Sequence, residues 1–438
     1  MPILSKDEAK KILTKVIGFS TADGCSATLA GNKSGNIRYA RNSVSTSGAS
    51  SDTTLVVQCN YGKKVATATI NEFDEGSLKK VVQRAQEMAK LSPENPEFMD
   101  TLPKQKYKSS NSWFDSTANA SPEYRAQAAA HSIEDSKKQK LIAAGFLNDT
   151  ADFTAIANNN GLFGYYTSTN VDFSVTIRTE DGKGSGWVTR DYNDMDKFDA
   201  RAASKVAIQK SAASAGAKAL EPGRYTVILE PAASVGLLNN MMANFDARTA
   251  DEGRSFLSKK GGGNKLGEKL FDEAVNIYSD PWNEEIPTAP WTGENLPAEK
   301  VSWIEKGVIK NLNYSRFWAS EKDVKPVAGT NNIIMLGGDK SLEQMIAKTK
   351  KGILVTRMWY IRPVDPQTLL YTGLTRDGTF YIENGKIKYP IKNFRFNESP
   401  VIMLNNIEEL GKPQRINGNL IPPMKIRDFT FSSLSDAV

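Results

Sequence analysis

Histidine is nearly absent from this chain of 438 residues, which contains a single one, His131. Every motif that needs two histidines is therefore excluded, including the short signatures by which zinc proteases bind their metal. A catalytic triad could draw only on His131, which lies in an alanine-rich stretch with no nucleophile motif beside it. We interpret His131 as an ordinary helix residue.

Cysteine and long apolar runs are also scarce. Two cysteines, Cys25 and Cys59, cannot build a disulfide framework, and this low content favours a reducing compartment. No run approaches the length of about 18 apolar residues that a membrane span needs. The first residues lack the basic and apolar regions of a signal peptide. We therefore expect a cytoplasmic protein without a membrane span or a membrane partner.

Charge of one sign is not in large excess. The 56 lysines and arginines against 50 aspartates and glutamates leave a formal net charge of +6, which is small for this length. Nucleic-acid binding needs basic residues clustered on one face. The longest basic cluster, residues 137–140, is typical of a solvated helix end. The sequence therefore predicts no nucleic-acid partner.

Helical and strand-like patterns alternate along the chain and predict an α+β fold of several domains. Breaks rich in proline and glycine separate an N-terminal α+β domain (1–100), a central α+β domain (101–219) and a β-rich C-terminal domain (220–438). Capping residues and apolar spacing predict helices over 6–17, 77–91, 122–138, 198–216 and 234–245, and one that begins after Ser341 and stops at Gly352. Strand patterns cover 24–30, 36–41, 52–60, 64–70, 141–147, 152–158, 162–168, 171–178, 225–229, 353–361, 379–383, 386–390 and 400–404.

Two polar segments look like ligand-binding loops at first sight. Residues 182–186 are rich in glycine but lack the helix that must follow a P-loop, so we expect a hairpin turn there. Asp191, Asp194 and Asp196 are closely spaced acids without the central glycine of a calcium loop. We interpret these three acids as part of a solvated turn.

Two long stretches of the C-terminal third resemble one known family. They are residues 354–362 (LVTRMWYIR) and 372–380 (TGLTRDGTF), followed by 382–385 (IENG) and 394–399 (FRFNES). Together they resemble the C-terminal domain of the TldD/TldE (PmbA) family, once called modulators of DNA gyrase. The order of elements fits this family along nearly the whole chain. The resemblance implies a proteolytic system in which a TldD subunit carries a metal and a TldE subunit does not.

The metal motif of the active family members is changed in this chain. Active members carry a His-Glu-x-x-x-His helix after a strand that ends in an acidic residue and proline. The resemblance places Asn239 and Asn244 at the two histidines, and Asn240 at the glutamate that acts as general base. An amide oxygen is a poor zinc ligand, and an amide cannot act as a base near neutral pH. The third ligand, a cysteine before Gly-Lys, corresponds to Leu410.

The altered motif leaves two interpretations open. The three asparagines are either helix residues that face a partner or a cavity, or amides that orient a peptide backbone by hydrogen bonds. In both cases we expect no catalytic, cofactor or metal site in this chain. Zinc or iron is expected only in a TldD-like partner.

The resemblance therefore implies a TldE-like, metal-free subunit that pairs with a TldD-like metalloprotease subunit and encloses unfolded or extended peptides. Strand addition to a sheet edge would hold such peptides regardless of sequence. Self-association into a homo-oligomer is left open. The candidate interface anchors, each of which could equally pack in a core, are Trp282, Trp291, Trp303, Trp318 and Trp359.

Two other functions stay open at this point. One is an independently active peptidase, which would need a serine–lysine pair or a metal held by oxygen ligands. The other is a nucleic-acid-associated modulator, which the diffuse charge disfavours.

Overall fold

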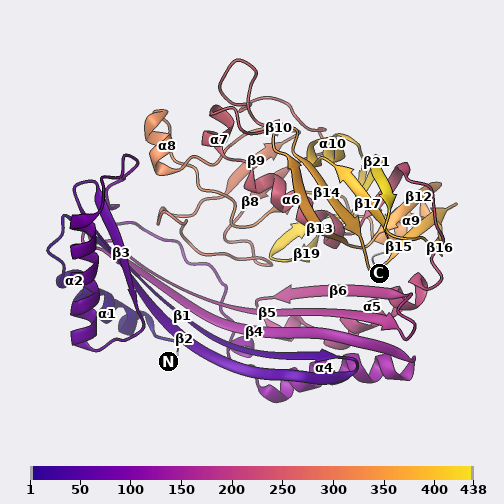
Figure 1. Ribbon diagram of the computed structural model, residues 1–438, viewed down its shortest axis with the longest axis horizontal. Coiled ribbons are helices and arrows are strands. Elements are labelled where there is room, and N and C mark those ends of the chain that lie inside the picture. Colours follow the sequence, from indigo (N-terminus) through magenta and orange to yellow (C-terminus); the bar gives the residue numbers. More distant parts are fainter. Residues whose placement is uncertain (1–2, 436–438) are drawn as a thin grey trace.

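A long antiparallel sheet runs through the first half of the chain (Figure 1) in the computed structural model, which describes residues 3–435. The strands follow the order β3-β2-β1-β4-β5-β6. Because β1 pairs with β4, the expected units 1–100 and 101–219 share this one sheet. The strands are β1 Gly24–Ala40, β2 Ser43–Tyr61, β3 Lys64–Ile70, β4 Leu141–Asn158, β5 Phe163–Thr179 and β6 Ser185–Tyr192.

The two faces of this sheet differ in polarity. Along β5, Val171 and Phe173 are buried in a core, whereas the alternate residues Ser168, Asn170 and Asp172 leave the sheet on the other face. Two pairs of helices cover the apolar face, one pair at each end of the sheet (Figure 1). These helices are α1 Lys6–Gly18 and α2 Glu75–Leu91 at one end, and α4 Pro122–Lys138 and α5 Ala200–Ser214 at the other.

The second half of the chain forms a mixed domain of two further sheets around helix α6, Pro231–Ala243. The larger sheet holds β7 Gly223–Leu229, β12 Lys351–Val355, β13 Met358–Asp365, β14 Leu370–Thr375, β15 Thr379–Glu383, β16 Lys386–Pro390, β17 Phe394–Glu398, β18 Ile407–Leu410 and β21 Met424–Leu434. The smaller sheet holds β8 Ile277–Ser279, β9 Val301–Glu305, β10 Val308–Ile309, β11 Ile334–Met335, β19 Gln414–Ile416 and β20 Asn419–Ile421. Short helices complete the fold: α3 Asp115–Ala118, η1 Met195–Lys197, α7 Ala247–Asp251, α8 Arg316–Glu321, α9 Leu342–Ala347 and α10 Pro400–Asn405. The expected α+β fold with a strand-rich C-terminal half is confirmed.

The hairpin expected at the glycine-rich segment 182–186 is present, with residues 180–184 between β5 and β6, and the start of β6 docks the sheet onto the C-terminal domain. Its Ser185 Oγ lies 2.5 Å from Asp377 Oδ1, and Asp377 also accepts a hydrogen bond from Arg357 at 2.5 Å. Gly186 permits close packing, because a Cβ there would lie 2.2 Å from the carbonyl oxygen of Ala207 on α5. Asp377 belongs to the motif that carries the family resemblance, and its role here is to join the two halves of the molecule.

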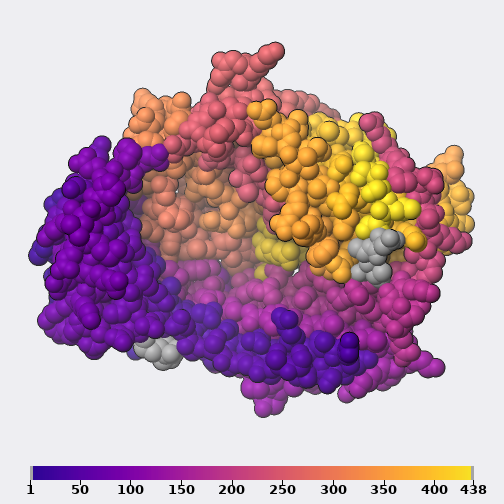
Figure 2. Space-filling view, in the orientation of Figure 1, coloured from indigo at the N-terminus to yellow at the C-terminus, as the bar shows by residue number. Residues whose placement is uncertain are grey.

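A wide hollow separates the far end of the long sheet from the C-terminal half. Figure 2 shows it between the indigo N-terminal lobe and the orange and yellow C-terminal domain, with the sheet below. The polar face of the sheet is thus turned toward the C-terminal domain.

Several strands predicted as separate pieces are continuous. The expected strands 24–30 and 36–41 form one strand, β1, which ends at Ala40 and whose polar middle pairs with β2 on one side and β4 on the other. The expected breaks in β4 and β5 are wrong for the same reason. Backbone pairing on both sides outweighs the weak strand preference of the polar residues between the halves.

One expected strand is a helix, and several boundaries shift. Residues 400–404 form α10, because Ser399 caps a helix that starts with proline. The short apolar run after that proline is compatible with a strand as well as with a helix, so the pattern alone did not decide between them.

The strand expected over 353–361 is divided between β12 and β13. The remaining corrections concern helix ends: α6 begins at Pro231 rather than 234, α2 begins after Asp74 rather than at Ser77, and Gly352 lies in β12 rather than ending α9.

Between residues 3 and 435, no helix is both long and apolar enough to cross a membrane.

A buried ion pair fixes helix α4 to the middle of the sheet. Arg125 Nη1 lies 2.7 Å from Asp149 Oδ1, with side chains 5% and 9% exposed. Gly35 leaves the space for this guanidinium, because a Cβ there would lie 2.2 Å from Arg125 Nη1. Burial raises the pKa of Asp149, and the attraction of Arg125 opposes that shift only in part.

Replacing Arg125 by methionine should destabilise the protein by about 3–5 kcal/mol, because the carboxylate of Asp149 is left buried without its partner. The double variant Arg125→Met/Asp149→Leu should recover most of that loss. Urea unfolding measures both. Lys138→Met is the control, since the Lys138–Asp135 pair at the end of the same helix is exposed and should contribute less than about 1 kcal/mol. An Arg125→Met variant as stable as this control would contradict the prediction.

Candidate functional site

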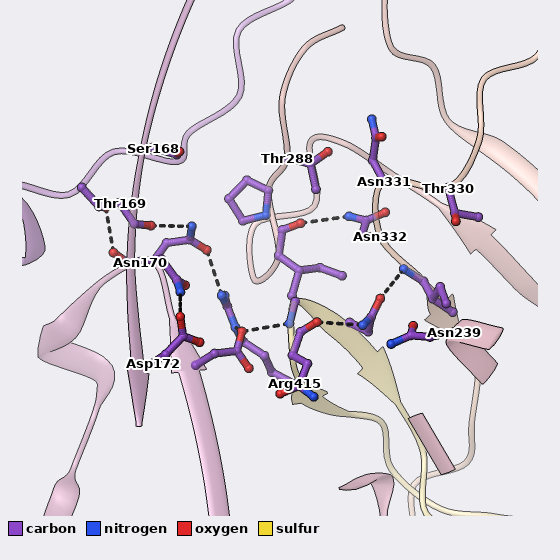
Figure 3. A pocket seen from close by; sticks show the side chains of 18 of the residues that line it. Ser168, Thr169, Asn170, Asp172, Asn239, Thr288, Thr330, Asn331, Asn332 and Arg415 are labelled. Atoms are coloured by element: carbon purple, nitrogen blue, oxygen red, sulfur yellow. Dashed lines mark hydrogen bonds and ion pairs between the residues drawn. The ribbon is translucent and has the colours of Figure 1, made fainter. Parts of the chain in front are cut away.

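A polar cavity of about 690 Å³ lies between the uncovered face of the long sheet and the C-terminal domain (Figure 3). One wall comes from β5 and β6, and the other from α6, the β19–β20 hairpin and two loops. Amides, hydroxyls and carboxylates dominate the lining. It consists of Tyr166, Ser168, Thr169, Asn170, Asp172, Asp191, Asn193, Asn239, Ala243, Ile286, Pro287, Thr288, Thr330, Asn331, Asn332, Ile333, Arg415, Asn417, Gly418 and Asn419.

Two aspartates lie opposite each other on the sheet side of the cavity. Asp172 of β5 and Asp191 of β6 are direct partners in the antiparallel ladder. Partners in such a ladder send their side chains to the same face. Both carboxylates therefore leave the sheet toward the cavity.

Asp191 is 5% exposed and joins the sheet to the C-terminal domain. Its Oδ2 accepts hydrogen bonds from Arg415 Nε and from the backbone nitrogen of Gly418, both at 2.9 Å. Arg415 also donates to Asn193 Oδ1 at 3.0 Å and to the carbonyl oxygen of Glu285. The guanidinium is thus held on three sides by the walls of the cavity.

Asp172 is exposed to the cavity but removed from bulk solvent. This loss of hydration raises the pKa of Asp172 to about 6, and the negative charge of Asp191 adds to the shift. A hydrogen bond from Asn170 at 2.5 Å and the charge of Arg415 act in the opposite direction. Near neutral pH the cavity therefore holds two adjacent carboxylates.

Asparagines form much of the opposite wall, and some of them fix its loops. Asn332 donates to the carbonyl oxygens of Asp280 and Ile286, each at 2.9 Å. Asn419 Oδ1 accepts from the backbone nitrogen of Ile333 at 2.8 Å. The side-chain amides of Asn239 and Asn331 make no hydrogen bond within residues 3–435, and they remain available to a ligand.

The structure brings only one of the three motif asparagines into this cavity. Asn239, on α6, is exposed there, across the cavity from Asp172 (Figure 3). Asn244 instead donates to the carbonyl oxygen of Asn240 at 2.8 Å and approaches the hydroxyl of Tyr371 at 3.4 Å. Asn244 therefore closes the end of α6, where it is the C-cap residue.

Leu410, expected at the place of the third ligand, lies at the end of β18 and packs against the core of the C-terminal domain. It does not line the cavity. The hairpin that follows it does, through residues 415–419.

The donor set at α6 does not fit a metal. The motif positions offer neutral amides, and one of them is engaged in capping the helix. In the described part of the chain no three His, Cys, Asp or Glu side chains are grouped so that they could hold a metal ion. The metal-free character of the purified protein stays a prediction.

The acids at 191–196 do not all share a solvated turn, and that interpretation is wrong for Asp191. Asp191 is buried in β6, and Asp194 accepts a hydrogen bond from Ser116 at 2.7 Å. Only Asp196 is exposed. His131 lies on α4 as expected, where its Nδ1 is 2.9 Å from Arg201 Nη2.

The tryptophans named as candidate anchors divide between core and surface. Trp303 is fully buried and Trp291 nearly so, which places both in hydrophobic clusters. Trp359, on edge strand β13, is 39% exposed and has Arg376 stacked on its ring at 4.3 Å. Of the five, Trp359 is the one whose exposure suits an interface.

Sequence reasoning missed Asp172 and Arg415. A signal for Asp172 was present, since Ser168, Asn170 and Asp172 alternate with the apolar Val171 and Phe173. That alternation marks a polar face, but it does not reveal what the face meets. Arg415 carries no local signal, because its side-chain partners Asp191, Asn193 and Glu285 lie more than a hundred residues away in sequence.

Comparisons with known proteins agree along the chain. Models of the PmbA/TldA metallopeptidases match it in three parts: domain 1 at residues 25–89, the central domain at 115–221 and the C-terminal domain at 222–433. "Metalloprotease PmbA" of Escherichia coli is 21% identical over 324 residues, 69% of each chain. A "Metalloprotease" of Methanothermobacter thermautotrophicus is 23% identical over 214 residues, and the match spans 44% of each chain.

Solved structures share the whole fold. TldE from Thermococcus kodakarensis superimposes with a TM-score of 0.86 at 17% identity, covering 97% of this chain and 99% of the other. A Thermotoga maritima protein, described as a proposed modulator of a DNA gyrase, gives a TM-score of 0.87 at 15% identity over 97% and 100% of the two chains.

Asp172 should make the stability of the protein depend on pH. Its raised pKa means that the folded state binds the proton more tightly than the unfolded chain. The resulting stabilisation is fully present below about pH 4 and is lost as pH rises through about 6. Urea unfolding of the parent chain and of Asp172→Asn at about pH 4.5 and about pH 7.5 measures this, and the loss should be smaller in the variant. Asp196→Asn, which removes an exposed carboxylate, should behave as the parent; equal losses in all three proteins would contradict the prediction.

Rebuilding the motif should create at most a weak zinc site. The variant Asn239→His/Asn240→Glu/Asn244→His supplies two imidazoles and a base, but no third protein ligand. Zinc titration with a competing chelator compares it with the parent chain, which should bind none. Tight, stoichiometric zinc in the triple variant would contradict the prediction. Adding Leu410→Cys tests the assignment of that position, which is wrong if zinc affinity does not increase.

Proposed function

This chain belongs to the PmbA/TldD family of metallopeptidases, and we propose that it is the metal-free, TldE-type subunit of a two-subunit protease acting on unfolded or extended peptides. In this proposal a TldD-like subunit supplies the metal and the hydrolytic step. The present chain contributes its polar cavity, which binds and positions the peptide.

Asn239 is the observation that carries the proposal. It is the altered motif position that lies on the cavity wall, and it presents a free amide where the active members of the family have a histidine. An amide can donate to a peptide carbonyl and accept from a peptide N–H, but it cannot activate water. This position therefore suits peptide binding without catalysis.

The chemistry of the cavity supports a peptide ligand. Apart from two aspartates and one arginine, its polar groups are amides and hydroxyls. Such groups match the donors and acceptors of an extended main chain and do not select a particular sequence. A protease that removes unfolded chains needs this tolerance.

The independent-peptidase alternative finds no support at this site. The described lining of the cavity contains no lysine, histidine or cysteine, so a serine–lysine pair has no base there. Lys210, on nearby α5, is paired with Glu230 at 2.6 Å, and both side chains are largely buried.

The purified chain alone should not cleave an unfolded peptide, whereas mixing it with a His-Glu-x-x-x-His relative from the same organism should give cleavage that a chelator abolishes. The control mixture contains that relative with its motif glutamate changed to glutamine, and it should be inactive. Copurification from the native cell tests the pairing separately. Chelator-insensitive cleavage by this chain alone would overturn the proposal.

A further inference from the structure

Strand β13 forms one edge of the nine-stranded sheet and carries two neighbouring aromatic side chains that are open to solvent. Trp359 is 39% exposed and Tyr360 is 56% exposed. Pro363 has no backbone N–H, and the pairing register of β13 breaks between Trp359 and Arg362, so this edge is protected against addition of another strand. The exposed aromatic residues therefore call for an explanation other than strand pairing.

A β-bulge places Trp359 and Arg362 on the same face of the sheet. Trp359 pairs with Leu374 and Arg362 pairs with Thr372, so three steps along β13 correspond to two steps along β14. Without the extra residue, the period of two would send Arg362 to the face opposite Trp359. The bulge thus gathers aromatic and basic side chains on one exposed surface.

Tyr360 lies in this bulge with a backbone φ of +56°, in the left-handed region that residues with a Cβ rarely adopt. Among residues 3–435 it is the one aromatic residue at a positive φ. Glycine would adopt this conformation without strain, and the exposed ring gains little from burial. Strain of this kind is kept mainly at functional sites.

Two arginines flank the aromatic pair. The guanidinium of Arg376 lies 4.3 Å from the centre of the Trp359 ring, and that of Arg362 lies 4.4 Å from the centre of the Tyr360 ring. The centres of the two rings are 5.4 Å apart. These four side chains form a continuous series, which we call the arginine–aromatic row. Stacking holds them in place and so lowers the entropy lost when a partner binds.

The surface carries positive charge that the chain itself does not neutralise. Arg395 on β17 lies in line with Trp359, because both residues pair with Leu374. Arg362 and Arg395 are exposed, and within residues 3–435 neither has a carboxylate at ion-pair distance. Such a surface is complementary to carboxylates that stand beside an apolar group. Tryptophan, tyrosine and arginine are also the residues that contribute most binding energy at protein interfaces.

We propose that the arginine–aromatic row, together with Arg395, is the docking surface for the metal-bearing, TldD-like subunit, and that this partner presents carboxylates beside an apolar side chain. The inference rests on the proposed function, because it names the surface through which the two subunits pair.

The position of β13 favours this occupant. Strand β13 packs on α6, where a Cβ at Gly236 would lie 2.8 Å from Ile361 Cδ1. Gly236 stands three residues before Asn239, which lines the polar cavity. The β13–β14 pair also borders the hollow (Figures 1 and 2). A subunit bound here lies beside the helix of the cavity wall, as a metal centre that must reach a peptide in the cavity requires.

Single-stranded nucleic acid fits this surface less well. It also stacks on aromatic rings, but it needs a basic groove that follows its backbone. Strands β13, β14 and β17 contain two arginines and no lysine. That number of cations is too small for such a groove.

The experiment measures the association of the purified full chain with a purified His-Glu-x-x-x-His relative from the same organism. Trp359→Ala and Arg362→Glu should each weaken association at least about tenfold. Ile387→Ala and Lys386→Glu are the matched controls, because both residues are exposed on β16, at the opposite edge of the same sheet. The control variants should bind as the parent chain does.

Tyr360→Gly separates docking from stability. Because glycine relieves the strained backbone, the isolated chain should unfold at the same or a higher urea concentration, whereas association with the relative should weaken. A tyrosine that serves only the fold would give the reverse result, with lower stability and unchanged association.

The outcomes distinguish this inference from the proposed function. If the parent chain associates and the three variants of the row associate equally well, the inference fails and the proposed function stands. If the parent chain does not associate with the relative, the proposed function fails too. Self-association or binding of a single-stranded oligonucleotide that requires Trp359 would assign the surface to another occupant and contradict the inference.

Discussion

The ion pair between Asp191 and Arg415 is the interaction on which the cavity depends. It connects β6 of the long sheet to the β19–β20 hairpin, and Gly418 of that hairpin donates to the same carboxylate. The hairpin in turn packs against α6, which carries Asn239. If this pair were lost, both walls would be free to shift relative to each other. The junction between the long sheet and the C-terminal domain is also held at two other points. These are the hydrogen bond of Ser185 with Asp377 and the ion pair of Lys210 with Glu230.

Local features of this fold could be predicted from the sequence, and long-range pairing could not. The capped helices begin close to the expected residues, because a capping box such as Ser5 with Glu8 is settled within one turn. The continuity of β1 is different. It depends on β2 and β4, and the latter begins about a hundred residues further along the chain. Periodicity within a short window cannot show that residues 1–100 and 101–219 share one sheet.

The same distinction explains what could be predicted of the site. The asparagines of α6 were recognised from a local motif, and the structure places Asn239 on the cavity wall. Asp191 was interpreted as part of a turn, because three neighbouring acids look solvated when only their own segment is considered. Its burial is caused by Arg415 and Gly418, which arrive from the far end of the chain. A buried charge of this kind can be found only when its partner is known.

Two carboxylates on the same sheet show how differently buried acids can be treated. Asp149 meets Arg125 in a closed ion pair that leaves neither side chain open to solvent, and glycine at position 35 makes the room for it. Asp191 shares its cation with two other acceptors, keeps one oxygen without a donor and stands opposite a second acid. Proteins keep such unfavourable arrangements mainly where they serve function. The Arg125–Asp149 pair is incomplete too, because Arg125 Nε has no acceptor within residues 3–435. The two sites differ in what they face, since Asp191 lines the polar cavity and Asp149 does not.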